Sequence, residues 1–222
     1  MTMDDDRRPL ASRNTGWARS LARTLTATGV TPNQISMASM VMAAVAGIAF
    51  WGAGAADGGL RLLLLLAAAL FCQLRLLCNL FDGMVAIEGG KQSPDGAFWN
   101  EFPDRVADLA ILVGAGYGIG APDLGWAATA LAVLTAYTRE LGRACGQPAD
   151  FSGPMAKQHR MATMTAAAIL SVSEPLWNGH NDVLKFALWV IAVGSALTAL
   201  RRARRLVVAL RSAPGTQRRG TH

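Results

Sequence analysis

Charged residues are scarce in this chain of 222 residues: they make up 16% of it, against 52% for hydrophobic residues. The charges are also clustered rather than dispersed as on a soluble surface, which indicates a membrane protein. The three cysteines lack the spacing of metal ligands, so we interpret them as small apolar packing residues: Cys72, Cys78 and Cys145. No secretory signal peptide is expected, because the aspartates at 4–6 come before a basic and interrupted stretch.

Long apolar segments fill more than half of the chain. A helix needs about 20 mainly apolar residues to cross a bilayer, and six such segments can be drawn: 33–52, 62–87, 98–119, 124–145, 160–177 and 183–200. A soluble bundle with a very apolar core is the alternative, but Leu62–Leu70 and Ala127–Leu134 lack the polar stripe of a water-facing helix. We therefore expect an all-α integral membrane protein, with a six-helix domain over residues 32–211.

The segment before the first span, residues 7–31, interleaves arginines with apolar residues. In helical projection Trp17, Leu21 and Leu25 share one face, largely away from the arginines. This pattern predicts an amphipathic helix that lies in the membrane interface, within a cytoplasmic arm over residues 1–31. A plain soluble arm is the alternative. Gly29 is the expected end of this helix, and Thr31 and Pro32 are the expected N-cap and first residue of the next one.

Basic residues indicate the orientation of the chain. Each connection on the side of the N-terminal arm holds a basic residue: 88–97 contains Lys91, 146–159 contains Lys157, and the tail over 212–222 follows a cluster of arginines at 201, 202, 204 and 205. Of the opposite loops, at 53–61, 120–123 and 178–182, only the first holds such a residue, Arg61. The positive-inside rule predicts a multi-pass protein of the cell (inner) membrane with both termini in the cytoplasm. Nucleic-acid binding is not expected, because aromatic residues do not interleave with the basic ones.

Two polar stripes lie at the cytoplasmic ends of the second and third predicted spans. The first contains Arg75, Asn79, Asp82 and Ala86, and the second contains Asn100, Asp104 and Asp108 with Glu101 beside them. A charge at membrane depth costs about 2.5–3.5 kcal/mol on insertion scales and usually faces a cavity or a partner. Oxygen ligands without histidine or thiolate suit a hard divalent cation, Mg²⁺ first and Mn²⁺ second. Buried ion pairs with Arg75 and Arg105 are the structural alternative.

The spacing of these residues resembles a family signature. Asn79-x-x-Asp82-Gly83-x-x-Ala86 followed by Gly96-x-x-x-Asn100-x-x-x-Asp104 keeps the register of D-x2-D-G-x2-A-R-x8-G-x3-D-x3-D, the motif of the CDP-alcohol phosphatidyltransferases. The resemblance extends to three further segments: Thr31-Pro32-Asn33-Gln34, Arg139-Glu140, and Gly153-Pro154-x-x-Lys157-x-x-Arg160.

The resemblance implies an integral membrane transferase, commonly a homodimer, that uses Mg²⁺ or Mn²⁺. Such an enzyme transfers a phosphatidyl group from a CDP-linked donor, usually CDP-diacylglycerol, to a small alcohol and releases CMP in phospholipid biosynthesis. The implied catalytic base is Asp104. The implied metal ligands are Asp82, Asp104, Asp108, Asn79 and Asn100; the implied nucleotide-binding residues are Asn33, Asn79, Asp82, Gly83, Ala86 and Gly96; and the implied acceptor-phosphate residues are Arg139, Lys157 and Arg160.

Three positions depart from the signature. Asn79 and Asn100 replace its first and third aspartates, and Ile87 replaces its arginine. Two negative charges are lost, which Asp108 and Glu101 could restore. We therefore expect an active variant, with a catalytically degenerate scaffold that binds lipid or nucleotide as the alternative. A small transporter is a weaker alternative, because the acids cluster at one membrane face. The acceptor stays open among inositol phosphate, glycerol phosphate, serine and others.

Overall fold

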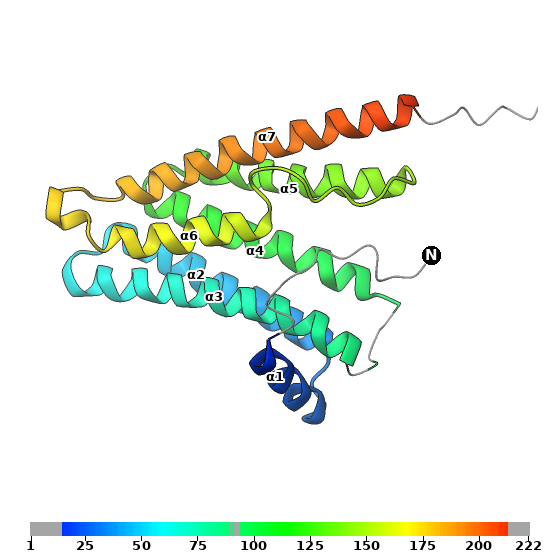
Figure 1. The fold of residues 1–222 in the computed structure, drawn as a ribbon. Coiled ribbons are helices and arrows are strands. Elements are labelled where there is room, and N and C mark those ends of the chain that lie inside the picture. Colours follow the sequence, from blue (N-terminus) through cyan, green and yellow to red (C-terminus); the bar gives the residue numbers. More distant parts are fainter. Residues whose placement is uncertain (1–14, 89, 91–93, 213–222) are drawn as a thin grey trace, which may run out of the picture.

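The computed structural model describes residues 15–88, 90 and 94–212, and these form helices without strands (Figure 1). The helices are α1 (Gly16–Ala27), α2 (Pro32–Ala55), α3 (Gly58–Glu88), α4 (Gly96–Gly118), α5 (Pro122–Ala144), α6 (Lys157–Ser171), the 3-10 helix η3 (Glu174–Trp177) and α7 (Asp182–Ser212). The all-α prediction is confirmed for this part of the chain. Helices α2–α7 run lengthwise through one bundle, and α1 lies across its lower side near the end of α3 (Figure 1).

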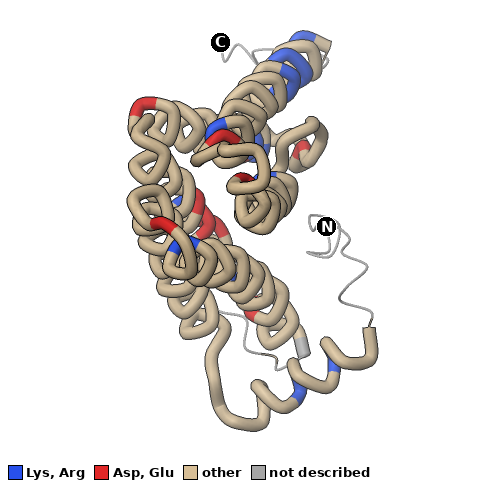
Figure 2. The backbone as a smooth tube through the Cα atoms, turned by 90° about the vertical axis from the view of Figure 1, so that its left-hand side faces the viewer, with Lys and Arg blue, Asp and Glu red and all other residues tan. Residues whose placement is uncertain are grey.

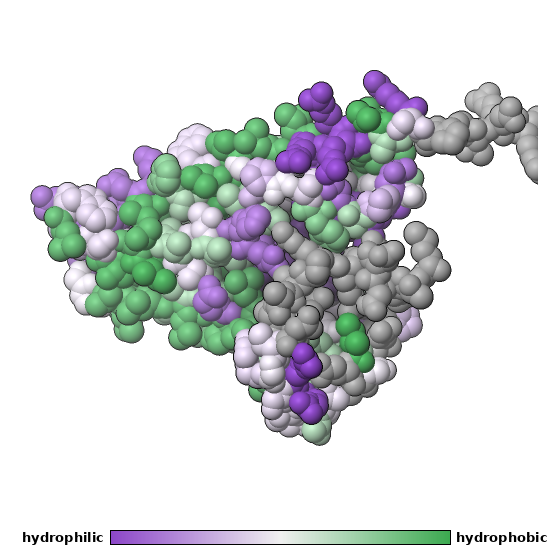
Figure 3. All heavy atoms as spheres, in the orientation of Figure 1, coloured by the Kyte–Doolittle hydropathy of each residue, from purple (hydrophilic) through white to green (hydrophobic). Residues whose placement is uncertain are grey.

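The outer surface of the bundle is apolar. Large side chains such as Ile48, Leu63 and Phe186 are 67%, 63% and 70% exposed, whereas small alanines make up much of the core. Figure 3 shows hydrophobic residues over much of the molecule and hydrophilic ones at the free end of α7. Among the described helices, α2, α3 (over Gly58–Ile87) and α7 are long and apolar enough to cross a membrane. The structure thus supports a membrane protein, and the count of six spans stays a prediction.

The fifth predicted segment differs from the structure. Residues 160–177 were expected to form one span, but α6 ends at Ser171 and η3 follows it. Pro175 explains why the α-helix does not continue, because proline has no backbone N–H to donate to the carbonyl oxygen four residues earlier. Glu174 is fully buried and accepts a 2.5 Å hydrogen bond from Arg61, so the turn is fixed across the end of the bundle.

Glycines set the distance between α2 and α4. A Cβ atom added at Gly54 would lie 1.7 Å from the carbonyl oxygen of Gly118, and one added at Gly114 would lie 2.3 Å from that of Gly47. The two helix backbones therefore touch, as small residues permit between membrane helices. This contact fixes the helix that carries Asp104.

The predicted helix boundaries near the N-terminus are confirmed. Gly29 has a φ of +81° just after α1, and Thr31 caps α2 with its side chain accepting from the Gln34 backbone amide. In α1, Trp17 and Leu21 are exposed, while Ala18 packs toward α3. An exposed apolar edge beside buried alanines agrees with an interfacial helix.

The prediction for the cysteines is confirmed only in part. All three are free, and Cys72 is buried, but Cys145 is exposed at the C-terminal end of α5 and packs against no core.

Candidate active site

The first polar stripe faces the interior of the bundle, as predicted. Asp82 is buried and accepts a 3.0 Å hydrogen bond from the Ser36 hydroxyl of α2. The Asn79 amide nitrogen donates to the Ser39 hydroxyl at 3.3 Å and to the Arg75 carbonyl oxygen at 3.2 Å. Helices α2 and α3 together therefore orient both oxygen-bearing side chains.

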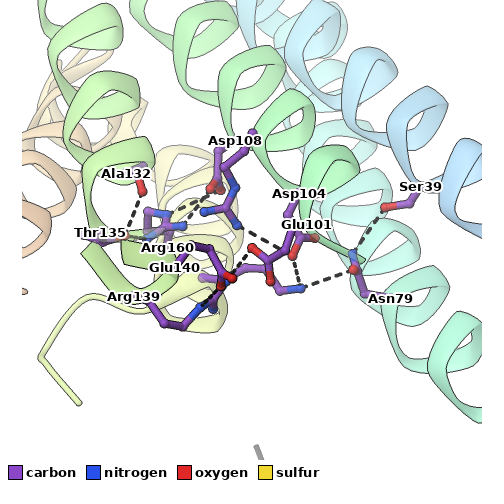
Figure 4. Close-up of polar contacts among 12 residues, drawn as sticks. Ser39, Asn79, Glu101, Asp104, Asp108, Ala132, Thr135, Arg139, Glu140 and Arg160 are labelled. Carbon is purple, nitrogen blue, oxygen red and sulfur yellow. Dashed lines mark hydrogen bonds and ion pairs between the residues drawn. The ribbon is translucent and has the colours of Figure 1, made fainter. Parts of the chain in front are cut away.

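Asp104, from the second stripe, is surrounded by positive charges. Its Oδ1 accepts from Arg75 at 2.9 Å, and its Oδ2 accepts from the Lys157 ammonium, with Arg105 at 3.7 Å. Lys157 also donates to the Asn79 amide oxygen at 3.2 Å. Lys157 therefore joins the two stripes, and Figure 4 shows Asn79 and Asp104 directed toward one another from α3 and α4.

Asp108 lies deeper and belongs to a separate ion pair. Its carboxylate is fully buried and accepts from Arg160 at 2.6 and 3.4 Å (Figure 4). Arg160 is also buried, and its guanidinium donates to the Met155 carbonyl oxygen at 3.2 Å and to the Thr135 hydroxyl at 3.5 Å. Asp108 and Arg160, predicted respectively as metal ligand and phosphate-binding residue, thus neutralise one another.

A third ion pair links α4 to α5. Arg139 donates to Glu101 and, at 2.8 Å, to Glu140, and its guanidinium lies 5.5 Å from the ring centroid of Phe151. Glu101, one possible source of replacement negative charge, is therefore paired with Arg139, the predicted phosphate-binding residue.

The remaining predicted residues belong to the starts of α2 and α4 and to the end of α3. Asn33 donates to the Asp95 carboxylate at 3.4 Å, just before Gly96 begins α4. The small residues Gly83 and Ala86 of α3 are half-buried, while Asn100 is exposed. These residues are near one end of the same helices, but no contact of Asn100 with the acids is found in the described part of the chain.

Helix α7 holds the loop that presents Lys157, a feature that the sequence interpretation missed. Thr198 accepts a 2.9 Å hydrogen bond from the Met155 amide, and Arg202 donates to the carbonyl oxygens of Ser152 at 2.9 Å and Thr135 at 2.7 Å. Gly153 has a φ of +123°, and a Cβ atom there would lie 2.4 Å from the Thr198 side chain. The Gly153-Pro154 pair was a visible loop signal, but nothing local showed that the loop packs on α7.

The same loop carries a perturbed carboxylate outside the apolar helices. Burial alone would raise the pKa of Asp150, but hydrogen bonds from Ser152 and the guanidiniums of Arg205 and Arg202 outweigh burial and lower it. Figure 2 shows the basic residues gathered along the free end of α7, beside this loop. The ionised carboxylate thus helps to hold the loop on α7.

The donor chemistry of the site suits a hard cation. Asn79 and Asp104 already direct their oxygens at one positive charge, the Lys157 ammonium, and Asp82 lies on the same face of α3 as Asn79. Carboxylate and amide oxygens are the ligands that Mg²⁺ and Mn²⁺ take. However, the described residues contain no group of three or more His, Cys, Asp or Glu side chains positioned to hold a metal. The three predicted aspartates do not form one cluster, because Asp108 is paired with Arg160.

Comparisons with known proteins find similar sequences among phosphatidylinositol phosphate synthases and the same fold in solved structures of such a synthase. No family model matches the chain.

Two of the similar proteins are named phosphatidylinositol phosphate synthase. The chain is 31% identical to the one from Streptomyces avermitilis over 132 residues, which cover 56% of the chain and 54% of that protein. It is 27% identical to the one from Mycolicibacterium smegmatis over 209 residues, covering 89% and 85%. The Mycobacterium tuberculosis synthase with CDP-DAG bound has the same fold, with a TM-score of 0.71 at 20% identity, covering 92% of this chain and 98% of that one. Its complex with manganese and citrate gives a TM-score of 0.72.

Proposed function

We propose that this chain is a metal-dependent membrane transferase that moves a phosphatidyl group from CDP-diacylglycerol to an alcohol hydroxyl and releases CMP, in phospholipid biosynthesis. The observation that carries the proposal is the convergence of Asn79 and Asp104 on the Lys157 ammonium, at the spacing of the family motif, with Asp82 on the same buried face of α3 as Asn79. The relatives named phosphatidylinositol phosphate synthase support this function, and the synthase with CDP-DAG bound supports the donor.

The residues of the site have distinct roles in this proposal. Phosphoryl transfer depends mainly on positioning and charge neutralisation, and a bound Mg²⁺ or Mn²⁺ would supply charge neutralisation at the donor phosphates. Asp82, Asp104 and Asn79 would hold that ion. Ser36 orients Asp82, and Arg75 holds Oδ1 of Asp104. Oδ2, which accepts from Lys157 in this structure, is the oxygen that would accept the proton of the acceptor hydroxyl once Lys157 has moved. Gly83, Ala86, Gly96 and Asn33 would border the nucleotide.

Asp108 and Asn100 have different roles in the proposal. Both were predicted as metal ligands, but Asp108 faces Arg160 and Asn100 is exposed. We assign Asp108 as the counter-ion of Arg160, and Asn100 stays a predicted ligand. Arg139 and Lys157 are the proposed contacts for a phosphate on the acceptor, and a phosphorylated alcohol such as inositol phosphate agrees with the names of the relatives.

The arrangement in the membrane is also part of the proposal. Helices α2–α7 form one transferase domain over residues 32–211 with six spans, and the site, the arm over 1–31 and the tail over 212–222 lie on the cytoplasmic side. The N-terminal arm, the end of α7 and the tail contain most of the basic residues, whereas the opposite loops contain only Arg61, which supports this orientation. A homodimer is expected from the resemblance.

A catalytically silent scaffold is the second candidate. The observation that favours it is the number of cations around Asp104, which neutralise the acid without a metal. A scaffold would bind nucleotide or lipid and release no CMP with any metal or acceptor.

The test is CMP release by the purified chain from CDP-diacylglycerol with Mg²⁺ and a panel of alcohols, with mass spectrometry of the lipid product. We expect Asp104→Asn to lower the rate by about 10²–10⁴-fold, the range for a general base. Asp57→Asn is the matched control, because the Asp57 side chain is 92% exposed at the far end of the bundle. Full activity in a folded Asp104→Asn variant would disprove the assigned base.

A further inference from the structure

The side chain of Lys157 lies at the oxygens that the proposed metal requires. Its ammonium donates to Oδ2 of Asp104 and, at 3.2 Å, to the amide oxygen of Asn79. Asp82 is buried on the same face of α3 as Asn79, three residues along the helix. A divalent ion held by Asn79, Asp82 and Asp104 would therefore compete with Lys157 for the same ligands.

The charges around Asp104 make that competition strong. Three cationic side chains, from Arg75, Arg105 and Lys157, surround Asp104, and Asp82 is the second acid nearby. Adding a divalent ion would place two more positive charges beside these three. Because like charges repel strongly in a partly buried site, at least one of the cationic side chains has to leave.

Lys157 is the cation best placed to leave. The Arg75 side chain is fully buried, whereas the Lys157 side chain is 28% exposed. Lys157 is also the first residue of α6 and has a flexible four-carbon stem, so its ammonium can swing away without moving a helix. Arg105 contacts Asp104 only at 3.7 Å and binds no second oxygen of the set.

We propose, on the basis of the proposed function, that Lys157 is a tethered cation that neutralises the metal-free site and leaves Asp104 when the divalent ion binds. The displaced ammonium then becomes available to the phosphate of the acceptor. Metal and phosphate binding are coupled in this arrangement, because each is favoured when Lys157 has left Asp104, and the coupling is reciprocal.

The test is a Mn²⁺ titration of the purified full-length chain, with free Mn²⁺ measured by electron paramagnetic resonance and no nucleotide or acceptor present. We expect Lys157→Met to bind Mn²⁺ more tightly than the native chain by about 5- to 150-fold, the usual range of coupling between sites. Lys157→Gln should show the same direction. Lys185→Met is the matched control, because Lys185 is exposed on α7 outside the site, and it should leave the affinity unchanged.

A second arm tests the coupling to phosphate. Sulfate, an analogue that stays soluble with Mn²⁺, should tighten Mn²⁺ binding to the native chain and have no such effect on Lys157→Met. Equal or weaker Mn²⁺ binding by both folded Lys157 variants would overturn the proposal, and so would sulfate coupling that survives Lys157→Met. Loss of the proposed function would be seen separately, as absence of CMP release by the native chain, because the Mn²⁺ titration needs no turnover.

Discussion

The buried pair of Asp108 and Arg160 separates two interpretations of the site. The sequence predicts Asp108 as a metal ligand that restores missing negative charge, whereas the structure pairs it with Arg160 at 2.6 Å, with side chains 0% and 1% exposed. Asp108→Asn would leave the Arg160 guanidinium buried without a counter-ion. Breaking such a pair from one side costs about 3–5 kcal/mol.

The magnitude can be expressed as a melting temperature. One kcal/mol shifts the midpoint by about 2–4 °C in a protein of this length, so Asp108→Asn and Arg160→Met should each lower it by about 6–20 °C. The double variant Asp108→Asn/Arg160→Met removes both charges, so it should melt higher than either single variant. Tryptophan fluorescence in detergent is a suitable measurement, because the chain contains six tryptophans.

The control is an exposed pair of the same residue types. Asp150 and Arg205 are 3.4 Å apart with side chains 26% and 58% exposed, and exposed pairs contribute about 0–1 kcal/mol. Asp150→Asn should therefore change the melting temperature little. The pairing interpretation is wrong, and Asp108 is a metal ligand, in either of two cases. One is that the melting temperature of the double variant falls by the sum of the two single decreases; the other is that the folded double variant no longer binds Mn²⁺.

Two further predictions concern helix packing and the loop on α7. Gly114→Ala should destabilise the chain by about 1–3 kcal/mol, the usual cost of overpacking, because its Cβ would lie 2.3 Å from the backbone of α2. The control is Gly59→Ala, which should leave the melting temperature almost unchanged because nothing lies within 4 Å of the added Cβ. Equal effects of the two variants would contradict the close contact. Thr198→Val should raise KM for the acceptor by about 5- to 30-fold, as expected for the loss of about 1–2 kcal/mol, with kcat less affected, because Thr198 positions the loop before Lys157. Thr198→Ser keeps the hydroxyl and should restore the native KM. An unchanged KM in Thr198→Val would refute this role.

Local features of this chain could be predicted because short-range chemistry determines them. Thr31 caps α2 because its hydroxyl reaches the Gln34 amide three residues later, and Asn79 and Asp82 share a face because helix geometry requires it. The inward direction of the first stripe follows in the same way, and α4 begins at Gly96, two residues before the predicted start at 98.

Some of the pairing between helices could not be predicted, because it depends on how distant segments pack. Arg61 meets Glu174 over a separation of 113 residues, and Lys157 meets Asp104 over 53. The second contact requires the loop at Gly153 to pack on Thr198, which no local pattern indicates. Ion pairs with Arg75 and Arg105 were foreseen as an alternative, and the structure pairs both with Asp104. The pairing of Arg160 with Asp108 was not foreseen.

The structure gives a physical reason for Asn79 at a motif position where an aspartate is expected. The amide nitrogen of Asn79 donates to the Ser39 hydroxyl and to the Arg75 carbonyl oxygen, while its amide oxygen accepts from Lys157. An ionised aspartate accepts but cannot donate, so Asn79→Asp would set a carboxylate oxygen against a carbonyl oxygen. The asparagine thus directs an oxygen that could ligate a metal at Lys157, while its amide nitrogen donates hydrogen bonds to acceptors on α2 and α3. With fewer acids to neutralise the cations around Asp104, the position of Lys157 decides whether the site can accept a metal.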